Sequence, residues 1–204
     1  MTEPMFPLLS LVRLRMGTDG EGVTTLIAGA GCPLDCRWCI NKKLLREAPA
    51  KPVTAADLLE KVRIDDLYFQ ATGGGVTFGG GESLLHAGFI RRFRELAPRE
   101  WRIRAETSLV VSRELLLTAM DAVDDFIVDC KDMNREIYHR YTGGDGSLMT
   151  ENLNLLLQSV GPERVLVRVP LIPEYNKEED RKRSEQTLRS MGVQKLDIFN
   201  YVIR

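Results

Sequence analysis

The sequence predicts an α/β fold, namely an incomplete (β/α)6 parallel barrel, and three observations predict it. Six short β-branched or apolar runs alternate with segments of helical periodicity along the 204 residues. Strands joined by such long connections pair in parallel, because a tight hairpin joins only antiparallel strands. Six strand–helix units are also fewer than the eight that close a full barrel, so we expect a sheet with an open side.

The strand-like runs follow one another at intervals that leave room for a helix between them. An apolar run at residues 8–14 precedes the barrel, and we expect it to add an edge strand. The six expected barrel strands are residues 23–27, 76–78, 101–105, 125–128, 164–169 and 195–199.

Caps and apolar spacing predict the helices between these strands. Thr54 and Asp57 form a capping box ahead of an apolar run, and Ser112 caps a later helix. Apolar residues at helical spacing fill residues 89–97, and Pro98 ends that helix. The remaining helical connections are expected at residues 134–141, 150–159 and 178–191.

Composition limits the classes of function. A chain of 204 residues that is 44% hydrophobic is long enough for one domain, residues 1–204, with its own core. A formal net charge of -1 argues against a nucleic-acid surface, and no apolar run approaches the roughly 20 residues that cross a bilayer. No secretory signal opens the chain and cysteines are few, so we expect a reducing compartment, the cytoplasm.

Cys32, Cys36 and Cys39 stand within eight residues and are the most informative feature of the chain. Three thiolates from one loop can hold three corners of an iron–sulfur cube, whereas an ordinary cluster site supplies four. One iron then stays open to a substrate, much as a catalytic zinc site keeps one position open. Zinc, with Cys130 as a fourth ligand, is the alternative interpretation. A disulfide framework fits less well, because four cysteines are too few to staple a chain of this size.

Polar groups follow successive expected strands at the carboxyl end, where parallel barrels collect their catalytic groups. They are residues 79–82, Glu106, Asp129 with Lys131, and Arg168. Asp129 and Lys131 alternate along a strand, so both side chains can point into one cavity while Cys130 faces the covering helices as a buried thiol. A guanidinium such as that of Arg168 suits a carboxylate ligand.

The cysteine spacing, with Trp38 before the last cysteine, resembles the motif of the radical S-adenosylmethionine (SAM) superfamily. Residues 19–25, 76–82, 129–131 and 170–176 resemble segments of the activating enzymes of glycyl radical enzymes, the group that contains pyruvate formate-lyase activase. Four positions depart from that group: Gly79 stands where serine is common, Ser83 where proline is usual, Glu106 where aspartate is usual, and Val202 where a histidine is often found.

The resemblance implies a 4Fe-4S cluster on Cys32, Cys36 and Cys39, with S-adenosylmethionine on the open iron. By motif match, Gly80, Gly81 and Glu82 would receive the amine of S-adenosylmethionine, and Trp38 and Ile40 would border its adenine. The ribose and carboxylate would be surrounded by Glu106, Asp129, Lys131 and Arg168.

The resemblance also implies partners. A reduced flavodoxin or ferredoxin would supply an electron, and the resulting 5′-deoxyadenosyl radical would abstract hydrogen from a backbone glycine of a partner glycyl radical enzyme. Two alternatives stay open at this stage. One is a radical SAM enzyme that acts on a small molecule or another peptide, and the other is a non-catalytic metal-binding or electron-carrier protein.

Overall fold

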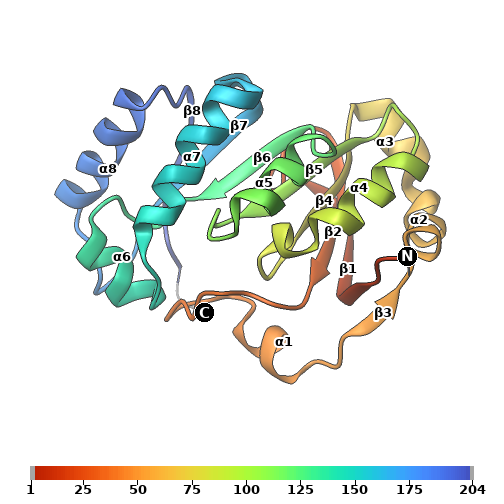
Figure 1. Ribbon diagram of the computed structural model, residues 1–204, viewed down its shortest axis with the longest axis horizontal. Coiled ribbons are helices and arrows are strands. Elements are labelled where there is room, and N and C mark those ends of the chain that lie inside the picture. Colours follow the sequence, from red (N-terminus) through yellow and green to blue (C-terminus); the bar gives the residue numbers. More distant parts are fainter. Residues whose placement is uncertain (1–2, 203–204) are drawn as a thin grey trace.

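Eight strands form one sheet in the order β3-β1-β2-β4-β5-β6-β7-β8 in the computed structural model, which describes residues 3–202 (Figure 1). The strands are β1 (Phe6–Met16), β2 (Val23–Gly29), β3 (Lys51–Val53), β4 (Gly75–Gly80), β5 (Arg102–Thr107), β6 (Asp125–Asp129), β7 (Val165–Leu171) and β8 (Lys195–Asn200). The run from β2 through β8 is parallel at every pairing. Within residues 3–202 the sheet ends on β3 and β8 and does not close, which confirms the predicted open barrel.

The expected edge strand at residues 8–14 lies in β1, but its predicted place at the edge is wrong. β3 pairs antiparallel with the outer side of β1, and Pro7 lies opposite Pro52. Proline has no N–H for a sheet ladder, so Pro52 is tolerated in the edge strand β3, and Pro7 comes before the first pair of β1 with β2, at Leu8. β3 has only three residues and leaves no periodic pattern in the sequence.

Most of the helices cover the outer face of the parallel strands, and the first helix lies away from the sheet and buries none of its residues (Figure 1). The helices are α1 (Lys42–Glu47), α2 (Ala55–Val62), α3 (Asp66–Thr72), α4 (Ala87–Leu96), α5 (Arg113–Met120), α6 (Arg135–Thr142), α7 (Gly146–Val160) and α8 (Glu178–Ser190), with short 3-10 turns at Arg63–Asp65, Ser83–His86 and Pro162–Arg164. The Ser112 cap is confirmed, since Ser112 accepts from Leu115 N at 3.4 Å. Only half of the predicted capping box forms at Thr54, which accepts from Asp57 N at 3.1 Å, while the Asp57 carboxylate accepts from the Thr54 hydroxyl at 2.8 Å and not from a backbone amide. Among residues 3–202, the helices lack the length and apolar composition that a bilayer span requires.

The core lies between the sheet and these helices, and aromatic side chains fill its middle. Phe78 of β4 meets Phe6 of β1 and Phe93 of α4 edge to face, at centroid distances of 5.7 and 5.5 Å. Such side chains stabilise the fold by about 1.5–3 kcal/mol each when fully buried. Cys130 belongs to this core and is fully buried, as predicted.

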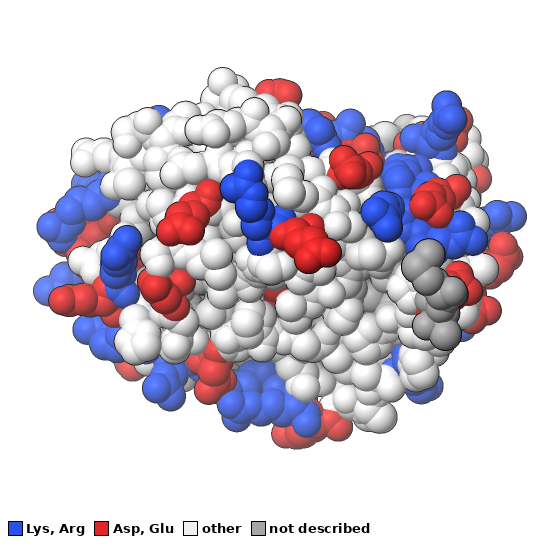
Figure 2. All heavy atoms as spheres, in the orientation of Figure 1, with Lys and Arg blue, Asp and Glu red and all other residues white. Residues whose placement is uncertain are grey.

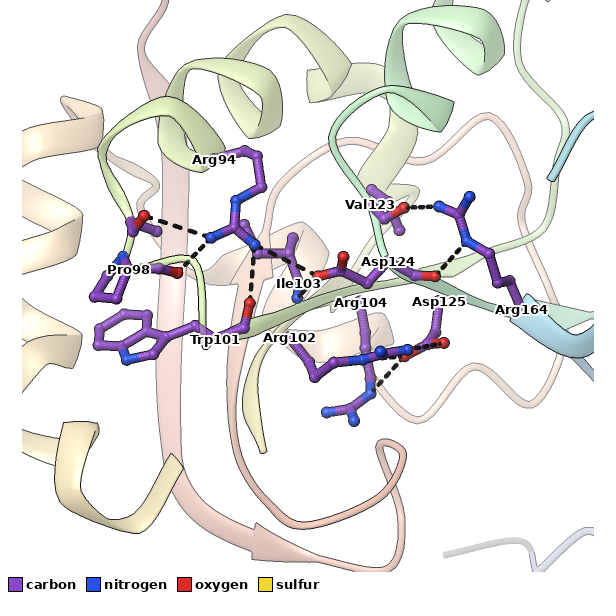
Figure 3. Close-up of polar contacts among 11 residues, drawn as sticks. Arg94, Pro98, Trp101, Arg102, Ile103, Arg104, Val123, Asp124, Asp125 and Arg164 are labelled. Carbon is purple, nitrogen blue, oxygen red and sulfur yellow. Dashed lines mark hydrogen bonds and ion pairs between the residues drawn. The ribbon is translucent and has the colours of Figure 1, made fainter. Parts of the chain in front are cut away.

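Arginines bind carbonyls and carboxylates at the amino ends of β5 and β6 (Figure 3). Arg164 donates to the carbonyls of Val123 and Asp124 at 2.5 and 2.8 Å, and fixes the turn that precedes β6. Arg102 and Arg104 share the carboxylate of Asp125, at 2.5 and 3.3 Å. We assign these contacts to stability, because the amino end of a parallel barrel is its structural end.

The strand register places the carboxyl ends of neighbouring parallel strands at the same level. Gly29 of β2 lies beside Gly80 of β4, and Asp129 of β6 lies beside Arg168 of β7. The loops that leave β2, β4, β5, β6 and β7 therefore meet at one rim, which is where the sequence placed its candidate residues.

Candidate functional site

Residues 30–41, here called the cysteine loop, connect β2 to α1 and carry Cys32, Cys36 and Cys39. Its backbone is held from several sides rather than by its own secondary structure. Asp35 N donates to Thr142 O at 2.9 Å and Arg37 N donates to Tyr141 O at 3.0 Å. The last turn of α6 therefore binds the loop backbone on both sides of Cys36. The Tyr201 hydroxyl, just past β8, donates to the carbonyl of Trp38.

The three thiols are free and line a cavity of about 280 Å³. Burial raises the pKa of Cys32, and it raises the pKa of Cys36 to about 11, so both carry protons until a metal displaces them. No three His, Cys, Asp or Glu side chains in residues 3–202 gather closely enough to hold a single metal ion. A cube needs no such convergence, because each thiolate binds a different iron.

Buried polar atoms without partners also cluster at this loop. Among the described residues, three buried side-chain N or O atoms find no hydrogen-bond partner: Trp38 Nε1, Tyr138 Oη and Arg104 Nη1. Trp38 lies in the cysteine loop, and Tyr138 lies on α6, one turn before the two carbonyls that bind this loop. Buried indole and phenol groups normally have an acceptor. The cavity, the free thiols and these two donors together fit a bound sulfur-rich group.

Residues 79–82, the glycine loop, pack directly on the cysteine loop. Gly81 N donates to Gly29 O at 3.1 Å, and Glu82 N donates to Gly31 O at 2.8 Å. A Cβ on Gly81 would lie 2.1 Å from the Gly31 carbonyl oxygen, so the approach requires glycine. The Asn41 amide donates to Gly80 O at 2.8 Å and ties the far end of the cysteine loop to the same turn.

Glu82 turns inward instead of facing the cavity. Its carboxylate is 2% exposed and accepts four hydrogen bonds, from the Thr107 and Ser108 hydroxyls at 2.6 Å each, from Ser108 N at 2.8 Å and from Leu84 N at 3.1 Å. Burial raises the pKa of Glu82 even against these donors. The structure thus places Glu82 as a link between the glycine loop and the exit of β5.

The other candidate charges do come together at the rim. Arg168 Nη1 lies 2.7 Å from Glu106 Oε1, and Lys131 Nζ lies 2.9 Å from Asp129 Oδ2. Arg168 also donates to the carbonyl of Thr18. Lys131 adopts a left-handed backbone conformation, φ 65°, at the point where β6 ends, a strained geometry of the kind that collects at functional sites.

The charges on this cluster set one another's pKa values. Burial raises the pKa of Glu106, and Arg168 only partly opposes it. Burial disfavours the Asp129 carboxylate too, but Lys131 and Arg168 outweigh it and the pKa of Asp129 is lowered. Burial would lower the pKa of Lys131, but Asp129 reverses this and the pKa is raised. The Asp129–Lys131 pair is therefore fully charged at neutral pH.

Two departures from the activase pattern compensate each other here. A Cβ on Gly79 would lie 2.7 Å from Glu106 Oε2, so glycine in β4 leaves the space that the longer glutamate of β5 fills. A third departure, Ser83, donates its hydroxyl to Glu106 O at 2.7 Å and anchors the same strand end.

The two residues expected at the adenine lie on the cysteine loop itself. Trp38 is half-buried with its indole N–H directed inward, and Ile40 is 77% exposed.

Sequence reasoning missed Asn41 and Tyr138. A polar residue two places after the last cysteine was the available signal for Asn41. Nothing separated Tyr138 from an ordinary core aromatic.

The Radical SAM superfamily model matches residues 26–183. Among curated proteins, pyruvate formate-lyase 2-activating enzyme of Escherichia coli (strain K12) is 28% identical over 216 residues, which covers 90% of this chain and 73% of that protein. Isethionate sulfite-lyase activating enzyme of Desulfovibrio desulfuricans is 25% identical, with 79% and 72% covered.

Solved structures share the fold. Streptococcus suis SuiB superposes with a TM-score of 0.67 at 13% identity, covering 87% of this chain, and SuiB bound to S-adenosylmethionine gives 0.65 at 12%. This chain spans 39% of the first SuiB structure, about two fifths of its length.

Proposed function

Because the chain belongs to the radical SAM superfamily, we propose that it is an activating enzyme that uses a 4Fe-4S cluster and S-adenosylmethionine to install a glycyl radical on a partner enzyme. The observation that carries the proposal is the cysteine loop, with three free thiols around one cavity and the glycine loop packed against it. The activating enzymes among the relatives support the choice of partner.

Cys32, Cys36 and Cys39 are the proposed cluster ligands. When both are bound, the cluster and S-adenosylmethionine supply the 5′-deoxyadenosyl radical that removes hydrogen from the target glycine. The chain's own task is to position and insulate that chemistry. The last turn of α6, Tyr201 and the glycine loop fix the cysteine loop before any ligand binds, so little ordering remains to be done on binding.

The four charged residues at the rim are the proposed site for the polar parts of S-adenosylmethionine. Lys131 and Arg168 present cations to its carboxylate, and Glu106 and Asp129 present acceptors to its ribose hydroxyls. Gly80 and Gly81 offer backbone to its amine, while Trp38 and the exposed Ile40 offer apolar surface to its adenine. Glu82 serves this site indirectly, since its bonds to Thr107 and Ser108 set the position of the neighbouring Glu106.

The electron donor is proposed to be a reduced flavodoxin or ferredoxin that docks on the cysteine loop and α1. Arg37, Lys43 and Arg46 are exposed there, and Asp35 offsets only part of their charge. Figure 2 shows basic side chains gathered at the lower rim, where Figure 1 places α1. A local basic patch on a chain of net charge -1 suits an acidic protein partner.

We also propose that residues 1–204 form a single radical SAM domain that works in the cytoplasm. One continuous sheet and one core over residues 3–202 support the first proposal. Residues 1–2 and 203–204 lie outside the described part of the chain. Four free cysteines support the second, because they persist best in a reducing compartment.

Anaerobic reconstitution with iron and sulfide, followed by paramagnetic resonance, tests the function. We expect a reduced 4Fe-4S signal that changes on addition of S-adenosylmethionine, and a glycine-centred doublet when the cognate glycyl radical protein is added. A signal indifferent to S-adenosylmethionine would refute the enzyme assignment, and cleavage without any glycyl doublet would refute the activase role.

The ligand assignment has its own test. Cys36→Ala is expected to lose the cluster, because two thiolates do not hold a cube, whereas Cys130→Ala keeps it. Iron and sulfide content per chain measure both. Cluster loss in Cys130→Ala would contradict the assignment.

A further inference from the structure

α6 does more than cover the sheet, because its last turn supports the segment around Cys36. The carbonyls of Tyr141 and Thr142 accept from the amides of Arg37 and Asp35, at 3.0 and 2.9 Å. Cys36 lies between those two amides. The carboxyl end of α6 therefore lies against the backbone on both sides of Cys36.

Tyr138 lies on the same face of α6 as Tyr141 and Thr142, one turn earlier, because positions three and four apart on a helix are neighbours. Its side chain is fully buried. The ring packs over the start of α7, where a Cβ on Gly146 would lie 3.2 Å from Tyr138 Cγ. The ring is thus held between α6 and the start of α7, and its hydroxyl is buried.

The Tyr138 hydroxyl finds no hydrogen-bond partner in residues 3–202. A buried phenol left in that state costs roughly 1–3 kcal/mol, so an acceptor is expected when the site is complete. Besides burial, Cys36 has the largest effect on the pKa of Tyr138, and Lys131, Cys130 and Glu82 have smaller effects.

Three of these four groups are poor acceptors. The Lys131 ammonium has no lone pair to offer. The Glu82 carboxylate already accepts four bonds. Burial raises the pKa of Cys130 far above its ordinary value, so it stays a thiol, which is a weak acceptor. Only Cys36 gains a strong acceptor on assembly of the site, because it becomes a thiolate when it binds iron.

We propose that the Tyr138 hydroxyl donates a hydrogen bond to the sulfur of Cys36 when that cysteine is a cluster ligand, and thereby raises the reduction potential of the cluster. The inference rests on the proposed function, since it needs the cluster. Reduction adds negative charge to the cluster, so a donor aimed at a ligating sulfur stabilises the reduced form more than the oxidised form.

Tyr138→Phe tests this by removing one oxygen without changing the shape of the ring. In a redox titration followed by paramagnetic resonance, the ratio of reduced to oxidised cluster at a fixed potential is expected to fall between threefold and tenfold. A tenfold fall corresponds to a midpoint about 59 mV more negative for one electron. Tyr68→Phe on α3 is the matched control, because the Tyr68 side chain is exposed and takes no part in holding the cysteine loop, and its midpoint should stay with the wild type.

The outcomes separate the two proposals. A wild-type protein that assembles no cluster refutes the proposed function. If the wild type assembles a cluster and Tyr138→Phe has the same midpoint potential, this inference alone is refuted. If Tyr138→Phe has the same midpoint potential but binds S-adenosylmethionine more weakly, the inference is also refuted, because the nucleotide would then be the acceptor. If Tyr138→Phe loses the cluster, 3,5-difluorotyrosine at position 138 keeps the hydroxyl and strengthens it as a donor. The reduced fraction should then rise, and no rise would overturn the proposal.

Discussion

At the residue scale, the space in front of Glu106 is the feature most specific to this chain. Glu106 Oε1 is held at 2.7 Å by Arg168, so the side chain has little freedom to move away from a larger residue at position 79. Gly79 and Glu106 should therefore behave as a coupled pair, since contacting residues give non-additive effects.

Gly79→Ala is expected to destabilise the protein by about 1–2 kcal/mol, the usual cost of overfilling a packed site. Adding Glu106→Asp should recover most of that loss, because the shorter acid vacates the position 2.7 Å from the new Cβ. Urea unfolding of the two single variants and the double variant measures the coupling. Strictly additive losses would contradict the steric explanation.

Gly81 makes the contact between the glycine and cysteine loops, and it cannot accept a side chain. Gly81→Ala forces a Cβ against a backbone carbonyl, which has no rotamer to change, so the loops must separate. We expect a loss of more than about 2 kcal/mol in stability and at least a severalfold loss of iron per chain.

Gly88→Ala in α4 is the matched control for that substitution. Nothing lies within 4 Å of a Cβ there, and alanine favours the helix by up to about 1 kcal/mol. If Gly81→Ala kept wild-type iron content and stability, the two loops would not depend on their contact.

The sequence located residues well but could not assign their partners. The position of the cysteines and of the charges of β5, β6 and β7 at one rim was predicted, because motif spacing and strand alternation fix where they lie. Glu82 was expected at the ligand, yet it is buried under four donors that come from the exit of β5. Such a choice between facing a ligand and facing a neighbour depends on tertiary packing, which a single sequence does not encode in any local pattern.

At the element scale, predictions succeeded where burial imposes a period. The barrel strands and the amphipathic helices were predicted within a few residues of their observed ends. α1 and β3 were missed because they are six and three residues long and bury almost nothing, so no periodic pattern forms. α3 was missed because Leu67 and Tyr68 are exposed and break the apolar spacing.

Asp65 joins three elements and gives the fold an acid-sensitive contact. It accepts from Arg13 of β1 at 2.6 Å and from the Thr25 hydroxyl of β2 at 2.7 Å. Burial opposes ionisation of Asp65, but the hydrogen bonds from these donors have the larger combined effect, so the pKa of Asp65 is lowered. The contact therefore contributes its full stability above the ordinary aspartate pKa of about 3.9, and loses it as pH falls through the lowered value.

Asp65→Asn should consequently flatten the acid side of the stability profile. We expect the cluster-free variant to be less stable than wild type at pH 7 and to lose less stability between pH 5 and pH 3. Thermal unfolding across that range measures both slopes. Parallel slopes would indicate that other carboxylates control acid unfolding.

At the scale of the whole molecule, the basic surface at the cysteine loop and α1 is the proposed docking site of the acidic electron donor. Replacing Arg37 and Lys43 together by glutamate is expected to slow cluster reduction by flavodoxin or ferredoxin about tenfold at low salt, with a weaker dependence on ionic strength. A small uncharged reductant should reduce both forms at equal rates, because it needs no docking surface and its approach does not depend on the local charge.

Lys182→Glu with Arg183→Glu on α8 makes the same change in net charge away from the cysteine loop and serves as the control. Equal slowing in both double variants would show that total charge, rather than the surface at α1, governs reduction.

The contact between Tyr201 and Trp38 spans 163 positions of sequence. A ribosome makes the cysteines early, whereas the α6 carbonyls and the tyrosine that immobilise them emerge more than a hundred codons later. The thiols of a nascent chain are thus presented on an unsupported segment for most of translation, open to oxidants and stray metals. The cysteine loop is therefore held in place to receive iron and sulfide only after synthesis has passed β8.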